Sequence, residues 1–177
     1  MTEPTLQYLT VEVTTFCNLN CRMCFKRGLK EMPYRHLSLE MFLKSLNEAN
    51  PRMGVTFVGL GEPLLNPDFY EMLKETRKRG LIINLVTNGL LMNEDWSKKL
   101  IELKTDKISI SLDAATKETY DSIRRGSDFN KVMANIRVLM KMKDSLGTNK
   151  PGVRLDMVLM KSNIKELPTF VKLAIEL

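Results

Sequence analysis

The residues from Phe16 to Phe25 read F-C-N-L-N-C-R-M-C-F and contain every cysteine of the 177-residue chain, namely Cys17, Cys21 and Cys24. Structural cysteines of a hydrophobic core usually occur singly along a sequence, and a disulfide framework uses an even number of them. Three thiols on one short stretch are instead typical of a loop that binds a metal ion or an iron–sulfur cluster. The C-x3-C-x2-C spacing supplies three ligands, which leaves one iron of a four-iron cluster free for a substrate or cofactor.

The sequence on both sides of this loop predicts alternating strands and helices. The strand directly before the loop runs from Tyr8 to Val13, where β-branched residues alternate with others. Four further apolar or alternating runs predict strands at Val55–Val58, which we expect to be buried on both faces, Leu81–Val86, Lys107–Leu112 and Val153–Met160. Apolar residues at helical spacing predict helices from Ser38 to about Asn50, from the Asn66–Pro67 cap to Arg79, from Asn93 to about Lys104, from Asp128 to the loop at Gly147, and from Asn163 onward. Strict alternation of this kind is typical of a parallel sheet with helices outside it.

Polar or glycine-rich residues follow the predicted strands at their carboxyl ends. Gly59-Leu60-Gly61-Glu62-Pro63 follows the second strand, Thr87-Asn88-Gly89 follows the third, and Ser111 and Asp113 end the fourth on what the strand period predicts to be the same side. Because ligands of parallel α/β sheets bind beyond the carboxyl ends of strands, these features favour one shared site in a curved sheet. Tight turns would also explain the glycines, and Asp113 would equally serve to cap or brace its loop.

Several of these segments resemble the radical S-adenosylmethionine (radical SAM) superfamily. The cysteine loop is similar to the family's C-x3-C-x-Φ-C loop, with Met23 at Φ. Gly59–Pro63 resembles its G-G-E-P motif, although Leu60 replaces the first glycine. Thr87–Gly89 resembles the T-N-G of its third strand, and the run from Ser111 to Gly126, S-L-D-A-A-T-K-E-T-Y-D-S-I-R-R-G, resembles the segment after its fourth strand. The resemblance covers essentially the whole chain.

The resemblance implies an α/β fold, the partial (three-quarter) TIM-type barrel of repeated β–α units, with residues 1–177 forming one radical SAM core domain. It implies that the three cysteines bind a [4Fe-4S] cluster whose open iron takes the amino and carboxylate groups of SAM. One electron then cleaves the sulfonium to a 5′-deoxyadenosyl radical, which abstracts hydrogen from a substrate. The residues that the resemblance assigns to SAM are Met23 near the adenine, Gly61, Glu62, Asn88, Ser111, Asp113 and Arg124.

The family core normally has a sixth strand, whereas this sequence stops at Leu177 within the fifth β–α unit. We therefore expect a core that is incomplete at its C-terminus, with any auxiliary cluster domain of the SPASM or twitch type outside it. Relatives of that type mature a peptide, a protein or a cofactor precursor, including a group that modifies tungsten-pterin enzymes. The implied electron donor is a protein such as ferredoxin or flavodoxin.

The composition of the chain bears on two alternative functions and excludes neither. The net charge of +6 is spread along the predicted helices and aromatic residues make up only 7% of the chain, so an RNA-modifying radical enzyme is less favoured. A zinc-stabilised binding domain without catalysis would need a fourth ligand such as His36, the only histidine. The sequence has no run of apolar residues long enough to cross a bilayer and no N-terminal secretory pattern. We therefore expect a cytoplasmic protein, in keeping with reduced thiols.

Overall fold

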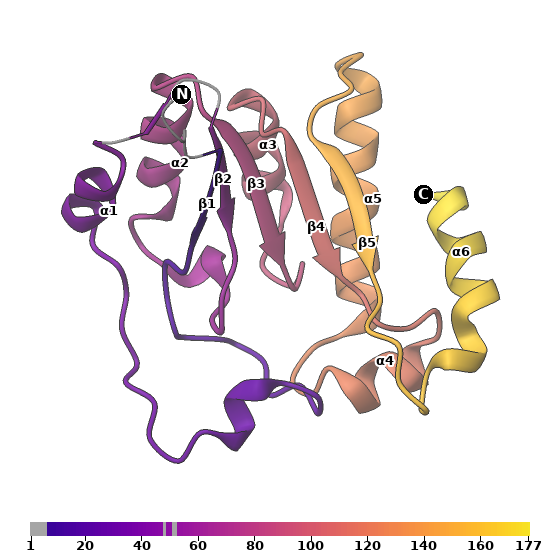
Figure 1. Cartoon of the computed structure of the whole chain (residues 1–177). Helices are drawn as coiled ribbons and strands as arrows, with labels where there is room; N and C mark the ends of the chain where they lie inside the picture. The colour runs from indigo at the N-terminus through magenta and orange to yellow at the C-terminus, as the bar shows by residue number, and fades with distance from the viewer. Residues whose placement is uncertain (1–6, 48, 51–52) are drawn as a thin grey trace, which may run out of the picture.

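The computed structural model describes residues 7–47, 49–50 and 53–177, and its centre is a five-stranded parallel sheet. The strands are β1 (Tyr8–Val11), β2 (Gly54–Phe57), β3 (Ile82–Thr87), β4 (Lys107–Ser111) and β5 (Gly152–Asp156). They lie side by side in chain order, and each pairs in parallel with its sequence neighbours (Figure 1). A doubly wound sheet would reverse its strand order, so the order confirms the predicted partial TIM-type barrel. β1 and β5 do not pair within the described part of the chain, so the sheet is open.

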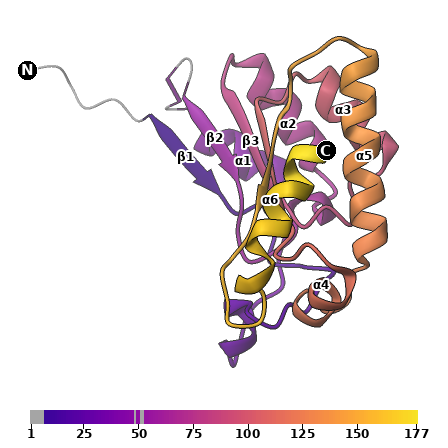
Figure 2. The ribbon, with the colours of Figure 1, turned by 90° about the vertical axis from the view of Figure 1, so that its right-hand side faces the viewer.

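Helices follow the strands and cover one face of the sheet. They are α1 (Leu39–Ser45), α2 (Phe69–Lys78), α3 (Glu94–Glu102), α4 (Lys117–Ile123), α5 (Phe129–Ser145) and α6 (Leu167–Glu176), with short 3-10 turns η1 (Phe25–Gly28), η2 (Pro63–Leu65) and η3 (Ile164–Glu166). In Figure 1, α2, α3 and α5 lie behind the strands, which places α3 and α5 on the right in Figure 2, and α4 lies beyond the carboxyl ends of the strands in both views. Three helices begin as predicted, because the side chains of Ser38, Asn93 and Asp128 accept backbone N–H bonds at their N-termini.

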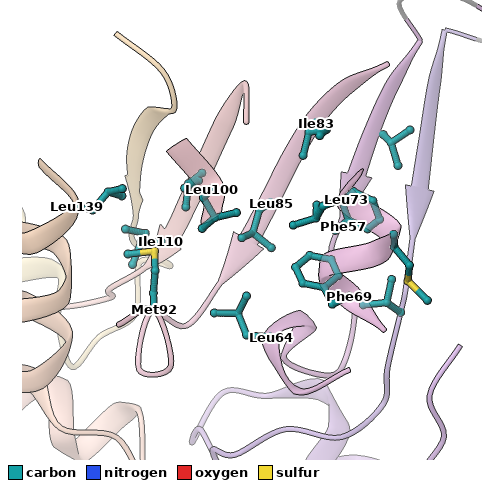
Figure 3. Packing of buried hydrophobic residues seen from close by; sticks show 14 of the residues in the cluster. Phe57, Leu64, Phe69, Leu73, Ile83, Leu85, Met92, Leu100, Ile110 and Leu139 are labelled. Carbon is teal, nitrogen blue, oxygen red and sulfur yellow. The ribbon is translucent and has the colours of Figure 1, made fainter. Parts of the chain in front are cut away.

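The hydrophobic core lies between the sheet and this helical layer. Alternate strand residues are fully buried, such as Phe57 of β2, Leu85 of β3 and Ile110 of β4, and they meet Phe69 of α2 and Leu100 of α3 (Figure 3). The side chains between them face the other way and are polar or only half-buried, for example Thr56 and Asn84. The prediction that β2 is buried on both faces is therefore wrong, because within the described residues helices cover only one face.

The bounds of several elements differ from the prediction, and one helix was not predicted. β1 ends at Val11 rather than Val13, and α1 ends at Ser45 rather than near Asn50. The helix after Asn66 begins two residues past the predicted Pro67, because the Asn66 side-chain oxygen accepts from Asp68 N–H at 2.8 Å in a turn that precedes the helix. The Asn66 amide donates to the carbonyl oxygens of Val13 and Leu37. α4 was not predicted, since only two of its residues, Tyr120 and Ile123, are buried and give a weak helical pattern. β5 ends at Asp156 rather than at Met160. Within the described residues, none of the helices is both long enough and apolar enough to cross a membrane.

Candidate functional site

A cleft of about 200 Å³ opens at the carboxyl ends of the strands, which point downward in Figure 1. It contains every residue that the sequence predicted for the site except Asp113. The cleft is lined by Cys17, Leu19, Cys21, Met23, Cys24, Val58, Gly59, Leu60, Gly61, Glu62, Val86, Thr87, Asn88, Ser111 and Arg124. Residues separated by more than a hundred positions thus meet in one place because parallel strands bring all their carboxyl ends to one edge.

The cysteine loop is held in place by backbone bonds to the end of α4. Asn20 N–H donates to the Arg125 carbonyl oxygen at 2.8 Å, and Arg22 N–H donates to that of Ile123 at 2.7 Å. The three thiols are free and half-buried. Burial raises the pKa of Cys17 and of Cys21 above its ordinary value, so metal binding, which needs thiolates, would release protons here.

This donor set fits an iron–sulfur cluster better than a single zinc ion. Among the described residues, no three His, Cys, Asp or Glu side chains lie close enough to share one metal ion. His36 does not line the cleft; its ring stacks on that of Phe16, with centroids 4.6 Å apart, and its backbone bridges to Thr14. A cubane binds its cysteines through different iron atoms, so the thiols need not converge on one point.

The turn after β2 packs directly against the chain that enters the cysteine loop. Glu62 N–H donates to the Phe16 carbonyl oxygen at 2.7 Å. A Cβ atom on Gly61 would lie 2.1 Å from the carbonyl oxygen of Thr14, so only glycine fits this close backbone approach. The G-x-G-E-P turn and the thiols are therefore one rigid unit, although Leu60 replaces a glycine of the motif.

Glu62 is a buried carboxylate that makes no ion pair among the described residues, although the nearby charge of Arg124 acts to lower its pKa. Its side chain is 2% exposed. One oxygen accepts from the Thr87 hydroxyl at 2.6 Å and the other from the Asn88 N–H at 2.8 Å. Burial raises its pKa above the ordinary value of 4.5, although these two hydrogen bonds act to lower it. A carboxylate in this position at the edge of a cleft attracts an ammonium group, which would supply the missing charge.

Arg124 supplies the opposite charge and is oriented by Asp113. Its Nε and Nη2 atoms lie 2.7 and 2.6 Å from one Asp113 oxygen, whose side chain is only 1% exposed. Asp113 adopts a left-handed backbone conformation with φ of 60°, so the strand alternation ends at Ser111. Ser111 and Arg124 therefore line the cleft while Asp113 lies outside it, which favours bracing, one of the two roles left open for Asp113.

Sequence reasoning missed the residues that connect these parts. Thr87 belongs to the quoted T-N-G turn, and it orients Glu62 as described above. Asn18 lies inside the cysteine loop and accepts from the Asn88 amide at 2.8 Å. Asn163 is fully buried and donates to the Asp113 carbonyl oxygen at 2.8 Å. The first two lie within the motifs and so had a signal, whereas nothing in the sequence links Asn163 to a residue fifty positions earlier.

The family model described as the Radical SAM superfamily matches residues 11–174. The chain belongs to the radical SAM superfamily. Its members use a [4Fe-4S] cluster and SAM, and the three thiols, Glu62 and Arg124 provide the matching thiolate, anionic and cationic groups.

Two curated relatives of this radical SAM chain are named as a cofactor-modifying protein and as a maturase. The tungsten-containing aldehyde ferredoxin oxidoreductase cofactor-modifying protein of Pyrococcus furiosus is 34% identical, and the match covers 97% of this chain and 49% of that protein. Mycofactocin maturase MftC of Mycobacterium tuberculosis is 31% identical over 94% of this chain and 41% of its own. The chain thus spans about half the length of the curated relatives it matches.

A solved structure of a radical SAM relative has the same fold and holds the nucleotide. Histidine-tagged anSMEcpe with bound AdoMet superposes with a TM-score of 0.76 at 28% identity, and the match covers 97% of this chain and 49% of that one. The open sheet described above is therefore the arrangement found in SAM-binding relatives. Maturases among the relatives agree with the branch that the sequence predicted.

Proposed function

We propose that this chain is the catalytic core of a radical SAM enzyme that cleaves SAM reductively and acts on a peptide, protein or cofactor-precursor substrate. The observation that carries the proposal is the single cleft in which three free thiols face Glu62, Ser111 and Arg124. When bound, the cluster would supply one electron to the sulfonium and so generate the 5′-deoxyadenosyl radical. The protein supplies binding, orientation and exclusion of side reactions.

The lining residues divide between the cluster and the two charged ends of the methionyl group. Cys17, Cys21 and Cys24 hold the cluster. The Gly61 backbone and the Glu62 carboxylate receive the ammonium group, since Glu62 makes no ion pair in the described structure and Arg124 is already paired with Asp113. Arg124 and Ser111 receive the carboxylate, for which a guanidinium provides a planar, bidentate partner. Met23 and Asn88 lie on the remaining walls and are assigned to the adenosine part.

The names of the relatives support the proposed class of substrate, which is a peptide, a protein or a cofactor precursor. One modifies the cofactor of a tungsten enzyme, one is a maturase of mycofactocin, and native anSMEcpe has been solved with bound AdoMet and the peptide Cp18Cys. We place this chain with them, acting in the cytoplasm on a peptide, protein or cofactor precursor. The electron would come from a protein such as ferredoxin or flavodoxin.

Anaerobic reconstitution with iron and sulfide tests the proposal. The protein should bind about four iron atoms, and the electron paramagnetic resonance spectrum of the reduced cluster should change when SAM is added. With dithionite as reductant it should release 5′-deoxyadenosine. Cys21→Ala should abolish cluster binding, while Ser122→Ala, on the exposed surface of α4, should leave it unchanged.

Two results would overturn this function. Stoichiometric zinc after anaerobic purification, together with no uptake of iron, would support the zinc-stabilised domain instead. An intact cluster in Cys21→Ala would show that the thiol assignment is wrong.

A further inference from the structure

A basic segment lies beside the cysteine loop, and we call residues 22–36 the basic flank. It contains five basic residues and one acidic residue, so its net charge of +4 accounts for most of the +6 of the whole chain. The basic residues are Arg22, Lys26, Arg27, Lys30 and Arg35. The flank is therefore a local excess of positive charge beside the thiols.

The basic side chains of the flank make no ion pair within the described structure. Some lysines on the helices differ, because Lys44, Lys74 and Lys99 each pair with an acidic residue one helical turn away. In the flank, Arg27 and Lys30 are among the exposed residues. Unneutralised charge gathered on one surface attracts an anionic partner and accelerates its approach.

The same surface exposes apolar side chains that are held in place. Phe25 is 73% exposed, Tyr34 59% and Leu29 37%. The Tyr34 ring lies 4.6 Å from Lys26 Nζ and 5.3 Å from the Phe16 ring, and Lys26 Nζ also donates to the Thr15 carbonyl oxygen. Aromatic and aliphatic groups with arginines around them are characteristic of protein–protein interfaces, where such anchors carry much of the binding energy.

The basic flank borders the cysteines on the side away from the SAM cleft. A second hollow, of about 300 Å³, is lined by Cys17, Cys24, Lys26, Arg27 and Tyr34 among others. Cys17 and Cys24 also line the main cleft, so the cysteine loop separates the two. In Figure 1 the cysteine loop and the flank lie beyond the carboxyl ends of the strands, at the bottom of the view. A protein docked on the flank would thus come close to the thiols without entering the cleft.

We propose that the basic flank is the docking surface for an acidic one-electron donor protein. The proposal rests on the proposed function, which consumes one electron for each SAM cleaved. The reduced flavin or iron–sulfur centre of the donor gives up one electron, the cluster held by the three cysteines takes it up, and no covalent bond forms. An RNA partner fits less well, because the cations of the flank surround a compact apolar centre next to the thiols.

Charge reversal on the flank tests this docking surface. The variant combines Arg27→Glu, Lys30→Glu and Arg35→Glu, and the matched control combines Lys131→Glu, Arg137→Glu and Lys141→Glu on the exposed side of α5. Calorimetry measures the binding of oxidised flavodoxin, an acidic electron carrier, to the reconstituted protein at low and at high ionic strength. Release of 5′-deoxyadenosine is measured with reduced flavodoxin and, separately, with dithionite.

The flank variant should bind flavodoxin about tenfold or more weakly at low ionic strength, and its rate with limiting reduced flavodoxin should fall in proportion. Its rate with dithionite and the behaviour of the control should match the unmodified protein. If the flank variant binds flavodoxin as tightly as the unmodified protein, while dithionite still supports cleavage, the docking surface is refuted and the proposed function is not. Loss of transfer-RNA binding in a gel-shift assay, with flavodoxin binding intact, would assign the flank to RNA. Failure of dithionite to support cleavage in the unmodified protein would refute the proposed function itself.

Discussion

Glu62 combines deep burial with hydrogen bonds that come only from neutral donors. The Thr87 hydroxyl and the Asn88 N–H bind its two oxygens, and Leu64 N–H adds a longer bond of 3.4 Å. Each donor lies on a turn at the carboxyl edge of the sheet, so the carboxylate joins the turn after β2 to the turn after β3. The cost of burying this charge is offset when an ammonium group binds beside it.

The pH dependence of stability should report on Glu62. Because burial raises its pKa above 4.5, the folded state holds a proton that the unfolded state releases. Its contribution to stability is therefore complete below the unfolded pKa and is lost as the pH rises through the raised value, with a slope of at most about 1.4 kcal/mol per pH unit. In Glu62→Gln this decline should be absent from urea unfolding curves of the unliganded protein recorded at a series of pH values. Exposed Glu118→Gln is the control, and an unchanged decline in Glu62→Gln would contradict the assignment.

Gly61→Ala should damage the site through the backbone. The new Cβ would lie 2.1 Å from the Thr14 carbonyl oxygen and 2.6 Å from that of Phe16, and neither is a flexible side-chain end. We expect a loss of about 1–3 kcal/mol in the free energy of unfolding and weaker cluster retention. Gly28→Ala is the matched control, because nothing lies within 4 Å of its Cβ position. Denaturant unfolding and iron content measure both effects, and equal values for the two variants would argue against a tight contact at Gly61.

At the scale of elements, Asn163 connects two loops that border the Arg124 site. Its amide donates to the carbonyl oxygens of Asp113 and Val158, both at 2.8 Å, and its side-chain oxygen accepts from Met160 N–H at 2.7 Å. Val158 N–H in turn donates to the Asp113 carboxylate at 2.7 Å. The loop after β5 thereby holds the loop after β4, and Asp113 passes that constraint to Arg124.

Asn163→Ala should therefore loosen Arg124 without touching the cleft. Two carbonyl groups and one N–H lose their partner, and because the bond to the Asp113 carbonyl is buried, its loss costs about 1–3 kcal/mol of folding free energy. If Asn163 is a positioning residue, the KM for SAM should rise severalfold while kcat at saturating SAM changes little. Ser122→Ala serves as the control. A fall in stability with an unchanged KM would reduce Asn163 to a purely structural role.

The elements that the sequence predicted well are those in which local pattern and packing agree. β4 and α5 have regular apolar periods, α5 also has the Asp128 cap, and both lie within two residues of where they were predicted. α4 was missed because it lies beyond the carboxyl ends of the strands, where only two of its side chains are buried. The cysteines, Gly61 and Glu62 form local motifs and were found for that reason. The pairing of Asp113 with Arg124 depends on a left-handed residue, and no local pattern indicates it.

At the scale of the whole molecule, the sheet has one covered face and one polar face. In-register residues Thr56 and Asn84 lie on the polar face, where the Asn84 amide donates to the Thr56 hydroxyl at 3.4 Å. Farther along the same face, Arg154 and Asp156 of β5 form an ion pair at 2.5 Å. This face leads to the cleft at the carboxyl edge, so a substrate that reaches the site across it would meet hydrogen-bonding and charged groups. A polar peptide or cofactor precursor suits that surface better than an apolar one.

The helix α6 exposes an apolar surface. Phe170 is the only residue of α6 that is buried in the core, whereas Leu167, Val171 and Ile175 are 39%, 50% and 79% exposed. Since such patches drive association in water, and β5 is an edge strand of the described sheet that invites pairing, we expect this 177-residue chain to self-associate as its concentration rises. Sedimentation velocity over a concentration series measures this.

Val171→Lys combined with Ile175→Lys should reduce that association. Both side chains point away from the core, so the free energy of unfolding should stay within about 0.5 kcal/mol of the original value. Lys172→Gln combined with Glu176→Gln changes two polar positions on the same helix and should leave the association as it is. Equal sedimentation of both double variants would show that the α6 surface is not where the copies meet. Association would then be assigned to the edge strands β1 and β5 or to the basic flank.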